Sequence, residues 1–348
     1  MNFKKAEKIL INKLRGLNFN EINLSEYSIN YLNFLTADIE ETLGRYSQVI
    51  KEAVLHTNSE ISQMTIVDYG GGTGLLSLLA KELGFQSVIY NDIFETSCKD
   101  VEKLSQAFKL DLDGIIHGDA SGLVEYLNSN SIKADLICSY DVIEHVYNVE
   151  NNFQSFSQLA KRPDCIVYGS GANIRNPFYS KSVRQKQISA EHHDREPSIG
   201  QKSADSLKSY LSLRKEIISD FASTLTRAEV DLLGKQTRGL VRSDIEETVR
   251  QYLDSGEISY RITHPTNTCD PLTGNWCENL LDFRWLLSTA RSAGFNAKFS
   301  KGLYSPSCSS LRGLLRLIFN ILNRSLGTFG FKFSPFYILI LQPSQKVS

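Results

Sequence analysis

Four glycines within five consecutive residues give the chain its clearest chemical signature. They are Gly70, Gly71, Gly72 and Gly74, and they follow a short apolar run that ends at Asp68. Because glycine has no Cβ, a ligand can lie directly on such a backbone. The carboxylate of Asp68 would repel a pyrophosphate, so it favours a ligand with a cationic amino group. The spacing therefore predicts a binding turn for a ligand that carries a positive charge.

A strand and a helix are predicted on either side of this turn. An apolar run ending in Ile66 and Val67 is typical of a buried strand, and a leucine stripe over residues 75–83 predicts a helix that Gly84 ends. The first turn of that helix offers unbonded N–H groups to a ligand carboxylate. Further strands and helices alternate along the chain. This alternation indicates a parallel doubly wound sheet, with ligands bound beyond the carboxyl ends of its strands.

The glycine spacing separates this turn from a dinucleotide-binding turn. Residues 67–74 read Val-Asp-Tyr-Gly-Gly-Gly-Thr-Gly, a G-x-G-x-G pattern, whereas dinucleotide folds use G-x-G-x-x-G. The string resembles the first motif of class I S-adenosylmethionine-dependent methyltransferases, in which the acidic residue lies beside the methionine end of the cofactor. The resemblance covers roughly residues 60–172 and 279–343. It implies that S-adenosylmethionine binds at Asp68 and the four glycines.

The same resemblance assigns further cofactor contacts to the ends of strands. Asp92 ends the second strand, where its carboxylate would accept hydrogen bonds from ribose hydroxyls, and Ile93 follows it. Asp119 would meet the adenine amino group, and Ala120 would supply a backbone N–H. Tyr140 ends the fourth strand, where it would border the reacting methyl group.

The residues after Tyr140 could act as catalysts or as metal ligands. Asp141, Glu144 and His145 have the i, i+3 and i+4 spacing of one helical face. Their string resembles a segment of quinone-biosynthesis-type methyltransferases, and also the cation-binding string of small-RNA 3′-end 2′-O-methyltransferases. One interpretation is a site for Mg²⁺ or Mn²⁺. The other is that Glu144 and His145 only cap and brace the following helix. Tyr140 and His145 are candidate catalytic residues.

Two adjacent histidines are further catalytic candidates. His192 and His193 lie in a polar stretch over residues 191–196. One of them could be a general base with a pKa near 7, or the fourth ligand of the metal. The alternative is that both are solvated surface residues.

The predicted fold is α/β, with a doubly wound, Rossmann-like, seven-stranded methyltransferase sheet in the order 3-2-1-4-5-7-6 that the resemblance implies. An N-terminal helical extension precedes the sheet, and a large, mostly helical insertion follows the fifth strand. The predicted domains are an extension over residues 1–63, an S-adenosylmethionine-binding core over 64–173, an insertion that serves as a substrate lid over 174–275, and the end of the core over 276–348.

Charge is distributed unevenly along the 348 residues, although the net charge is only −1. No Asp or Glu follows Asp282, whereas residues 283–348 contain nine Lys and Arg. Within this segment, an amphipathic helix is predicted over residues 311–326, with Arg312 and Arg316 on its narrow polar face. The apolar face could pack on the body or form a homodimer. Alternatively, the helix could lie on an anionic membrane with its arginines at the phosphates.

Composition excludes several classes of protein. None of the six cysteines forms a C-x-x-C pair, so neither a zinc ribbon nor a redox motif is supported. The N-terminus lacks the apolar run of a signal peptide, and no stretch reaches the ~18 apolar residues of a spanning helix. We therefore expect a cytoplasmic protein, or one that is peripheral to the membrane.

The segment Ser-Tyr-Asp-Val at residues 139–142 favours O-methylation, because it replaces the Asn/Asp-Pro-Pro-Tyr/Phe signature of base-amino methyltransferases. The predicted substrate is a hydroxyl on a small-molecule, glycan or lipid-linked compound. A metal-assisted RNA 2′-O-methyltransferase is one alternative, although the mixed charge of the insertion disfavours nucleic acid. A nucleotide-binding oxidoreductase is disfavoured by the glycine spacing. A non-catalytic nucleotide-binding module is disfavoured by the intact Asp68 and Asp92.

Overall fold

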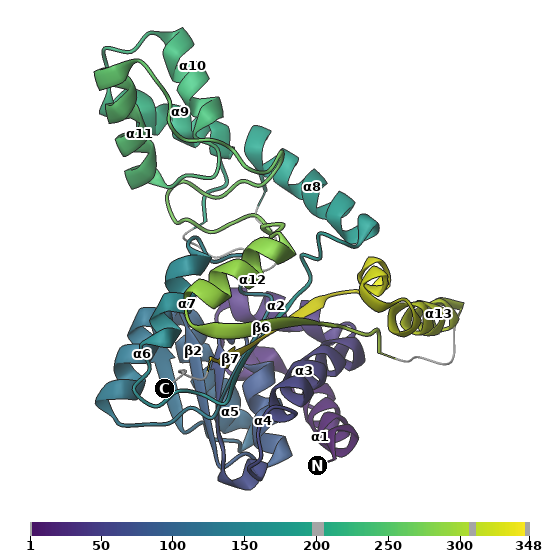
Figure 1. Cartoon of the computed structure of the whole chain (residues 1–348). Coiled ribbons are helices and arrows are strands. Elements are labelled where there is room, and N and C mark those ends of the chain that lie inside the picture. The colour runs from purple at the N-terminus through teal and green to yellow at the C-terminus, as the bar shows by residue number, and fades with distance from the viewer. Residues whose placement is uncertain (1, 197–204, 306–310, 345–348) are drawn as a thin grey trace. The chain divides into compact units, whose positions relative to one another are not determined.

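The computed structural model describes residues 2–196, 205–305 and 311–344, and the chain forms two compact units (Figure 1). The first unit comprises Met1–Ile143, Asn148–Asn176 and Asp282–Ser348. The second comprises Glu144–Tyr147 and Pro177–Leu281.

A mixed sheet of seven strands forms the centre of the first unit. Its strands are β1 (Thr65–Tyr69), β2 (Ser87–Asp92), β3 (Gly114–His117), β4 (Leu136–Tyr140), β5 (Cys165–Ser170), β6 (Phe295–Lys301) and β7 (Tyr337–Pro343). Their order, β3-β2-β1-β4-β5-β7-β6, confirms the predicted one. The first five strands are parallel, and β7 is antiparallel to both β5 and β6. The carboxyl ends of β1, β2 and β4 therefore meet at one edge, where ligands bind in such sheets.

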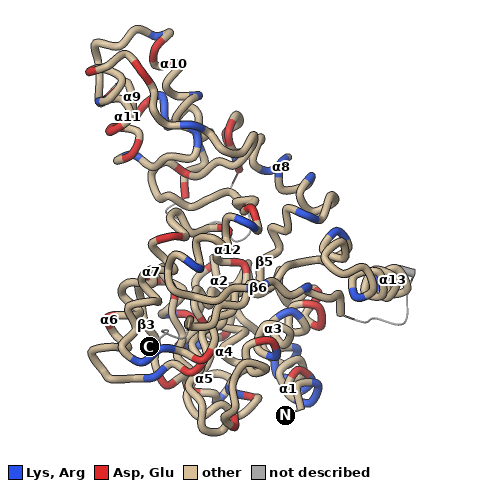
Figure 2. The backbone as a smooth tube through the Cα atoms, in the orientation of Figure 1, with Lys and Arg blue, Asp and Glu red and all other residues tan. Residues whose placement is uncertain are grey.

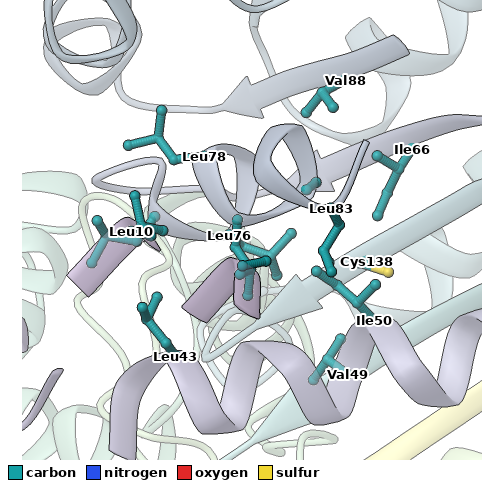
Figure 3. Packing of buried hydrophobic residues seen from close by; sticks show 14 of the residues in the cluster. Leu10, Leu43, Val49, Ile50, Ile66, Leu76, Leu78, Leu83, Val88 and Cys138 are labelled. Atoms are coloured by element: carbon teal, nitrogen blue, oxygen red, sulfur yellow. The ribbon is translucent and has the colours of Figure 1, made fainter. Parts of the chain in front are cut away.

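Most helices of the first unit cover the sheet with an apolar face, and α13 is an exception that is described below. The helices of the first unit are α1 (Phe3–Arg15), α2 (Glu26–Thr36), α3 (Ile39–Val54), α4 (Leu75–Leu83), α5 (Glu95–Phe108), α6 (Ala120–Ser129), α7 (Val149–Ser157), α12 (Phe283–Ser292) and α13 (Leu311–Ser325), with short 3₁₀ turns η1 (Phe19–Glu21), η2 (Ile61–Gln63) and η3 (Gly327–Phe333). In Figure 3, Ile50 of α3 lies beside Leu83 of α4 and Cys138 of β4. All three side chains are buried, so the N-terminal helices complete the core of the sheet instead of forming a separate layer.

Helix α2 is fixed at its start by a contact with α5. The side chain of Ser25 caps α2 by accepting from the Ser28 N–H at 3.2 Å. The backbone N–H of Ser25 also donates to Asp100 of α5 at 3.1 Å, and so does its hydroxyl. Helix α2 therefore begins beside the helix that follows β2.

The described residues of the second unit form four helices and irregular segments. The helices are α8 (Pro177–His192), α9 (Tyr210–Phe221), α10 (Arg227–Gln236) and α11 (Arg242–Ser255). A small apolar core joins α9, α10 and α11 through residues that include Ile218, Leu233 and Val249, all fully buried. Helix α8 joins the unit through a small apolar cluster of Ala190 with Tyr210 and Leu213 of α9. Polar contacts add to it, such as the amide of Gln187, which donates to the carbonyl of Glu278 at 2.8 Å.

Helix α13 packs against the first unit through its polar face. Arg316 lies near two acidic side chains, Asp38 at 3.2 Å and Glu41 at 3.5 Å. The prediction that the apolar face could bury against the body is therefore wrong, and Arg316 is not available to a membrane phosphate. The side chain of Arg312 lies outside the described residues. None of the helices in the described ranges is long and apolar enough to span a bilayer.

Candidate active site

The turn after β1 holds three glycines in the left-handed region. Gly70, Gly72 and Gly74 have φ values of 68°, 53° and 78°. A Cβ on Gly70 would collide with Val142, and one on Gly74 with Val101. A Cβ on Gly72 would meet only the Tyr31 ring, at 3.7 Å. Packing and φ thus require glycine at the outer two positions, whereas Gly72 leaves its backbone open to a ligand.

Asp68 lies under this turn, at 2% exposure. One of its carboxylate oxygens accepts from the backbone N–H of Ser77 at 3.0 Å and from the Ser77 hydroxyl at 2.7 Å. Burial raises the pKa of Asp68 to about 7, although the Ser77 hydrogen bonds oppose the shift. Gly71 packs directly against the Asp68 carboxylate, because a Cβ added to Gly71 would lie 2.7 Å from the oxygen that Ser77 contacts. Asp68 therefore connects the turn to the first turn of α4.

Asp92 joins the tip of β2 to the glycine turn. One carboxylate oxygen accepts from the Gly72 N–H at 2.9 Å, and the other accepts from the Phe94 N–H at 2.7 Å. The Tyr90 hydroxyl donates to the Gly72 carbonyl at 2.7 Å. The N–H and the carbonyl of Gly72 are thus both fixed by side chains of β2.

The remaining predicted cofactor contacts follow β2 and β3. Ile93 is 63% exposed, and its carbonyl oxygen lies 3.1 Å from a ring nitrogen of His117. Asp119 caps α6 by accepting from the Gly122 N–H at 3.0 Å, and Ala120 is buried. An exposed isoleucine next to Asp92 offers an apolar surface on which a flat base could lie.

Tyr140 ends β4 among aromatic rings. Its ring makes edge contacts with Tyr46 and Phe336, each at 5.5 Å between centroids, and its hydroxyl accepts from Arg45 at 3.3 Å. Burial raises the pKa of Tyr140 well above its ordinary value, and the charge of Asp141 raises it further. The phenol therefore stays protonated at neutral pH and cannot act as the general base, although it can donate a hydrogen bond.

Asp141 lies next to Tyr140 in an unusual backbone conformation. Its φ is 54°, which asparagine and aspartate tolerate better than most residues. Its carboxylate accepts from the Gly171 N–H at 2.9 Å, so it links the ends of β4 and β5. Asp141 belongs to the first unit, whereas Glu144 and His145 belong to the second.

No metal centre is found in the part of the chain that the structure describes. Within these residues, no group of three or more His, Cys, Asp or Glu side chains could hold an ion. Asp141, Glu144 and His145 therefore do not form the helical ligand set that the sequence suggested. The cause is local, because residues 141–147 form turns and bends, and no helix begins until Val149.

His145 has a defined tautomer. Its Nδ1 lies 2.9 Å from the carbonyl oxygen of Trp276 in the same unit. Since a carbonyl can only accept, Nδ1 carries the proton and donates it. In the neutral ring, Nε2 is then the unprotonated nitrogen. His145 thus presents a proton acceptor, whereas Glu144 is fully buried.

His192 and His193 lie at the end of α8. Both are exposed, and both belong to the second unit. The backbone N–H of His193 continues the helix by donating to the Ser189 carbonyl. Within the second unit the two histidines have the character of solvated surface residues.

Several residues beside the glycine turn were missed by the sequence analysis. Tyr31 faces Gly72, and Tyr27 makes an edge contact with Phe94 at 5.3 Å between ring centroids. Ser77 and Arg45 are the partners of Asp68 and Tyr140. The two tyrosines are four residues apart, so they share a helical face, and this spacing was the one available signal.

A model of a methyltransferase domain family matches residues 40–205 of the chain. The match begins within α3, includes β1 to β5, and is slightly shorter than half of the chain. No curated protein sequence matches the chain.

Solved structures with a related fold include methyltransferases at low sequence identity. Phosphoethanolamine N-methyltransferase 2 from Haemonchus contortus, in complex with S-adenosyl-L-methionine, is 11% identical with a TM-score of 0.42, over 94% of this chain and 60% of that one. A putative sarcosine dimethylglycine methyltransferase from Galdieria sulphuraria is 10% identical with a TM-score of 0.40, over 98% of both chains. This chain thus spans less than two thirds of the length of the first of these proteins.

The family match covers the glycine turn and the acidic residues that end the neighbouring strands. The order of the seven strands is the one expected from the resemblance of that turn. Residues 40–205 therefore match a methyltransferase domain, and the sheet has the strand order that the resemblance to class I S-adenosylmethionine-dependent methyltransferases implies.

Proposed function

We propose that the enzyme transfers a methyl group from S-adenosylmethionine to a hydroxyl of a small-molecule, glycan or lipid-linked substrate. The single observation that carries the O-methyl assignment is the hydrogen bond from His145 Nδ1 to the Trp276 carbonyl, which in the neutral ring leaves Nε2 as a proton acceptor. A hydroxyl is a poor nucleophile until its proton is removed, and a neutral imidazole is suited to that task at neutral pH.

The glycine turn has the features needed to hold the cofactor. The methionine end would lie on the open backbone of Gly72, with its carboxylate at the N–H groups that begin α4. Asp68 provides negative charge below this point for the cationic amino group. Asp92 would accept the ribose hydroxyls, and Ile93 would pack on the adenine.

Bound S-adenosylmethionine supplies a methyl group on a sulfonium centre, which needs little chemical activation. The protein would contribute alignment and a base. Transfer to a hydroxyl would also need a base for the hydroxyl proton. On its chemistry alone, His145 is the candidate for this base, because its Nδ1 donates to the Trp276 carbonyl and Nε2 of the neutral ring can then accept a proton.

The proposal can be tested with cofactor that carries ¹³C in its methyl group. The purified protein is incubated with this cofactor and with cell extracts, and the labelled product is observed by ¹H–¹³C correlation spectroscopy. The methyl carbon of an ether or ester has a chemical shift distinct from that of an N-methyl group. A new O-methyl signal is expected, and an N-methyl signal would overturn the assignment to a hydroxyl.

A His145→Gln variant tests the role of the base. Loss of a general base lowers kcat by about 10²- to 10⁴-fold. The affinity for S-adenosylmethionine should not change, because no cofactor contact is assigned to His145. The exposed His193→Gln variant is the matched control and should keep wild-type turnover. Equal rates in all three proteins would exclude His145 as the base.

A further inference from the structure

The C-terminal helix of the first unit has its polar face turned inward. Arg316 forms the ion pairs described above. The side-chain oxygen of Asn320 accepts from the Tyr304 N–H at 2.9 Å, and the Asn320 side-chain nitrogen donates to the Tyr304 carbonyl at 2.9 Å. Asn323 is fully buried, and its amide donates to the Gly302 carbonyl at 2.8 Å. Lys301 also donates to the carbonyl of Asn323. These contacts fix the rotation of α13 about its own axis.

The outward face of this helix and of the following turn is therefore apolar. Its residues, which we call the apolar face, are between 38% and 55% exposed. They are Leu314, Leu315, Leu317, Ile318, Ile321, Leu326 and Phe329. A continuous row of this size is uncommon on the surface of a monomeric protein and marks an interaction site.

A basic pocket adjoins the apolar face at Phe329. The pocket has a volume of about 350 Å³ and is lined by Arg175, Thr328, Phe329 and Lys332. Lys332 lies over the Phe329 ring at 4.1 Å, and Arg175 lies over the Phe283 ring at 5.0 Å. Among the described residues, neither cation pairs with a carboxylate. Both therefore keep N–H donors for an anion, and Thr328 adds a hydroxyl.

The segment that forms the apolar face contains basic residues and no acidic ones. Residues 311–333 contain no Asp or Glu, and the tube of α13 carries blue segments and no red in Figure 2. A second copy related by two-fold symmetry would bring Arg324 and Lys332 of both chains to one interface, where like charges repel. An anionic surface would instead neutralise them. The charges thus favour a lipid surface over a homodimer.

We propose that the apolar face docks on an anionic lipid surface, with a lipid phosphate in the pocket of Arg175, Thr328 and Lys332. The leucines would enter the boundary between head groups and acyl chains, as in other interfacial amphipathic helices. In contrast to the arrangement expected from the sequence, the contact uses the pocket cations, while Arg316 holds the helix in place. This inference does not depend on the nature of the methyl acceptor.

Vesicle flotation of the full chain tests the proposal. At low salt, wild type should float with vesicles that contain phosphatidylglycerol and stay at the bottom of the gradient with vesicles of phosphatidylcholine alone. High salt should release it from the anionic vesicles. Leu317→Ser with Ile321→Ser should abolish binding. Arg175→Ala with Lys332→Ala should weaken it about 30-fold, since each surface cation contributes roughly fivefold.

Matched controls distinguish this contact from nonspecific binding of the protein to vesicles. Phe34→Ser with Leu55→Ser removes two other exposed apolar side chains, at 59% and 73% exposure, and should bind like wild type. Arg291→Ala removes an exposed cation away from the pocket and should cause much less than the 30-fold loss. All replaced residues are exposed, so each variant should unfold at the wild-type temperature.

Two outcomes would overturn the proposal. In the first, wild type fails to float with anionic vesicles at low salt. In the second, sedimentation equilibrium shows a dimer that Leu317→Ser with Ile321→Ser dissociates, and the apolar face is then an interface between copies of the chain.

Discussion

Ser77 donates two hydrogen bonds to a single carboxylate oxygen of Asp68, from its backbone N–H at 3.0 Å and from its hydroxyl at 2.7 Å. These bonds favour the ionised carboxylate, whereas burial disfavours it more strongly and raises the pKa of Asp68 to about 7. Near neutral pH the side chain is therefore divided between its charged and neutral forms. A cation that binds beside it would draw it into the charged form.

The stability of the protein should fall with rising pH because of Asp68. The unfolded chain loses this proton near the ordinary aspartate pKa of 3.8, whereas the folded chain keeps it up to about pH 7. In this window the folded state binds more protons, so the free energy of unfolding decreases by up to about 1.4 kcal/mol per pH unit from this group. Asp68→Asn should remove this component of the slope. Urea denaturation of both proteins from pH 5 to 8 measures it, and parallel profiles would contradict the prediction.

Cofactor binding should show the opposite dependence on pH. Because the ionised Asp68 attracts the amino group of S-adenosylmethionine, the affinity of wild type should increase as pH rises toward 7 and then level off. Calorimetry in buffers with different ionisation enthalpies should detect a proton released on binding at pH 6. Asp68→Asn should bind more weakly and release no proton there. Proton release that persists in this variant would assign the titration to another group.

The open backbone of Gly72 should be essential for cofactor binding. Gly72→Val places a branched side chain where only the Tyr31 ring lies within 4 Å, so it would fill the proposed ligand space. Gly84→Val is the matched control. Gly84 also has a positive φ, 87°, and a Cβ added there would meet no atom within 4 Å. Both variants lose stability through backbone strain, by about 1 kcal/mol or more. Only Gly72→Val should lose S-adenosylmethionine binding, and equal binding by both would exclude Gly72 from the site.

The sequence was sufficient for the strand, turn and helix around Asp68, whereas the sheet order came from the resemblance to a known family. These elements have strong local signals, because buried parallel strands form continuous apolar runs and glycine marks positions with positive φ. Asp92 could be placed at the tip of β2 for the same reason.

Helix α8 could not be recognised from hydrophobic periodicity. Its buried positions are Ser180, Val183, Gln187, Ala190 and Glu191, which have helical spacing but only two apolar members. Gln187 and Glu191 are buried because they have polar partners far away in the sequence. A helix whose buried face is largely polar shows no hydrophobic periodicity in its sequence.

The orientation of α13 could not be predicted for a related reason. An apolar stripe normally faces the core, and here the partners of Arg316 are Asp38 and Glu41, which lie near the opposite end of the sequence. Nothing in the local sequence indicates such distant carboxylates. The same limit explains why Tyr31 and Ser77 were missed, since their roles depend on tertiary contacts.

Removal of Arg316 should loosen α13. Arg316→Met leaves Glu41, whose side chain is 5% exposed, without one of its cationic partners, although Arg45 remains at 3.2 Å. We expect a loss of about 1–3 kcal/mol in the free energy of unfolding, or in local opening of the helix. Arg324→Met, at an exposed position of the same helix, should change it by less than about 0.5 kcal/mol. Hydrogen exchange over residues 311–325 would measure the opening, and equal exchange in both variants would contradict the prediction.

The second unit contains a fully buried arginine whose loss should strongly destabilise it. Arg214 forms a two-point ion pair with Glu191, and its Nε donates to the Gly234 carbonyl at 2.9 Å. Glu191 also accepts from the Thr268 hydroxyl at 2.7 Å. Arg214→Met would leave a buried carboxylate without its cation, which costs about 3–5 kcal/mol.

Three comparisons make this last prediction specific. Arg250→Met breaks the pair of Arg250 with Glu247, whose side chains are more than half exposed, and should cost less than about 1 kcal/mol. Glu191→Gln combined with Arg214→Met removes both charges and should recover part of the lost stability. Since the proposed cofactor contacts all belong to the first unit, Arg214→Met should still bind S-adenosylmethionine at low temperature while calorimetry shows an earlier unfolding transition. If the variant instead loses cofactor binding and shows no separate early transition, the two units unfold together.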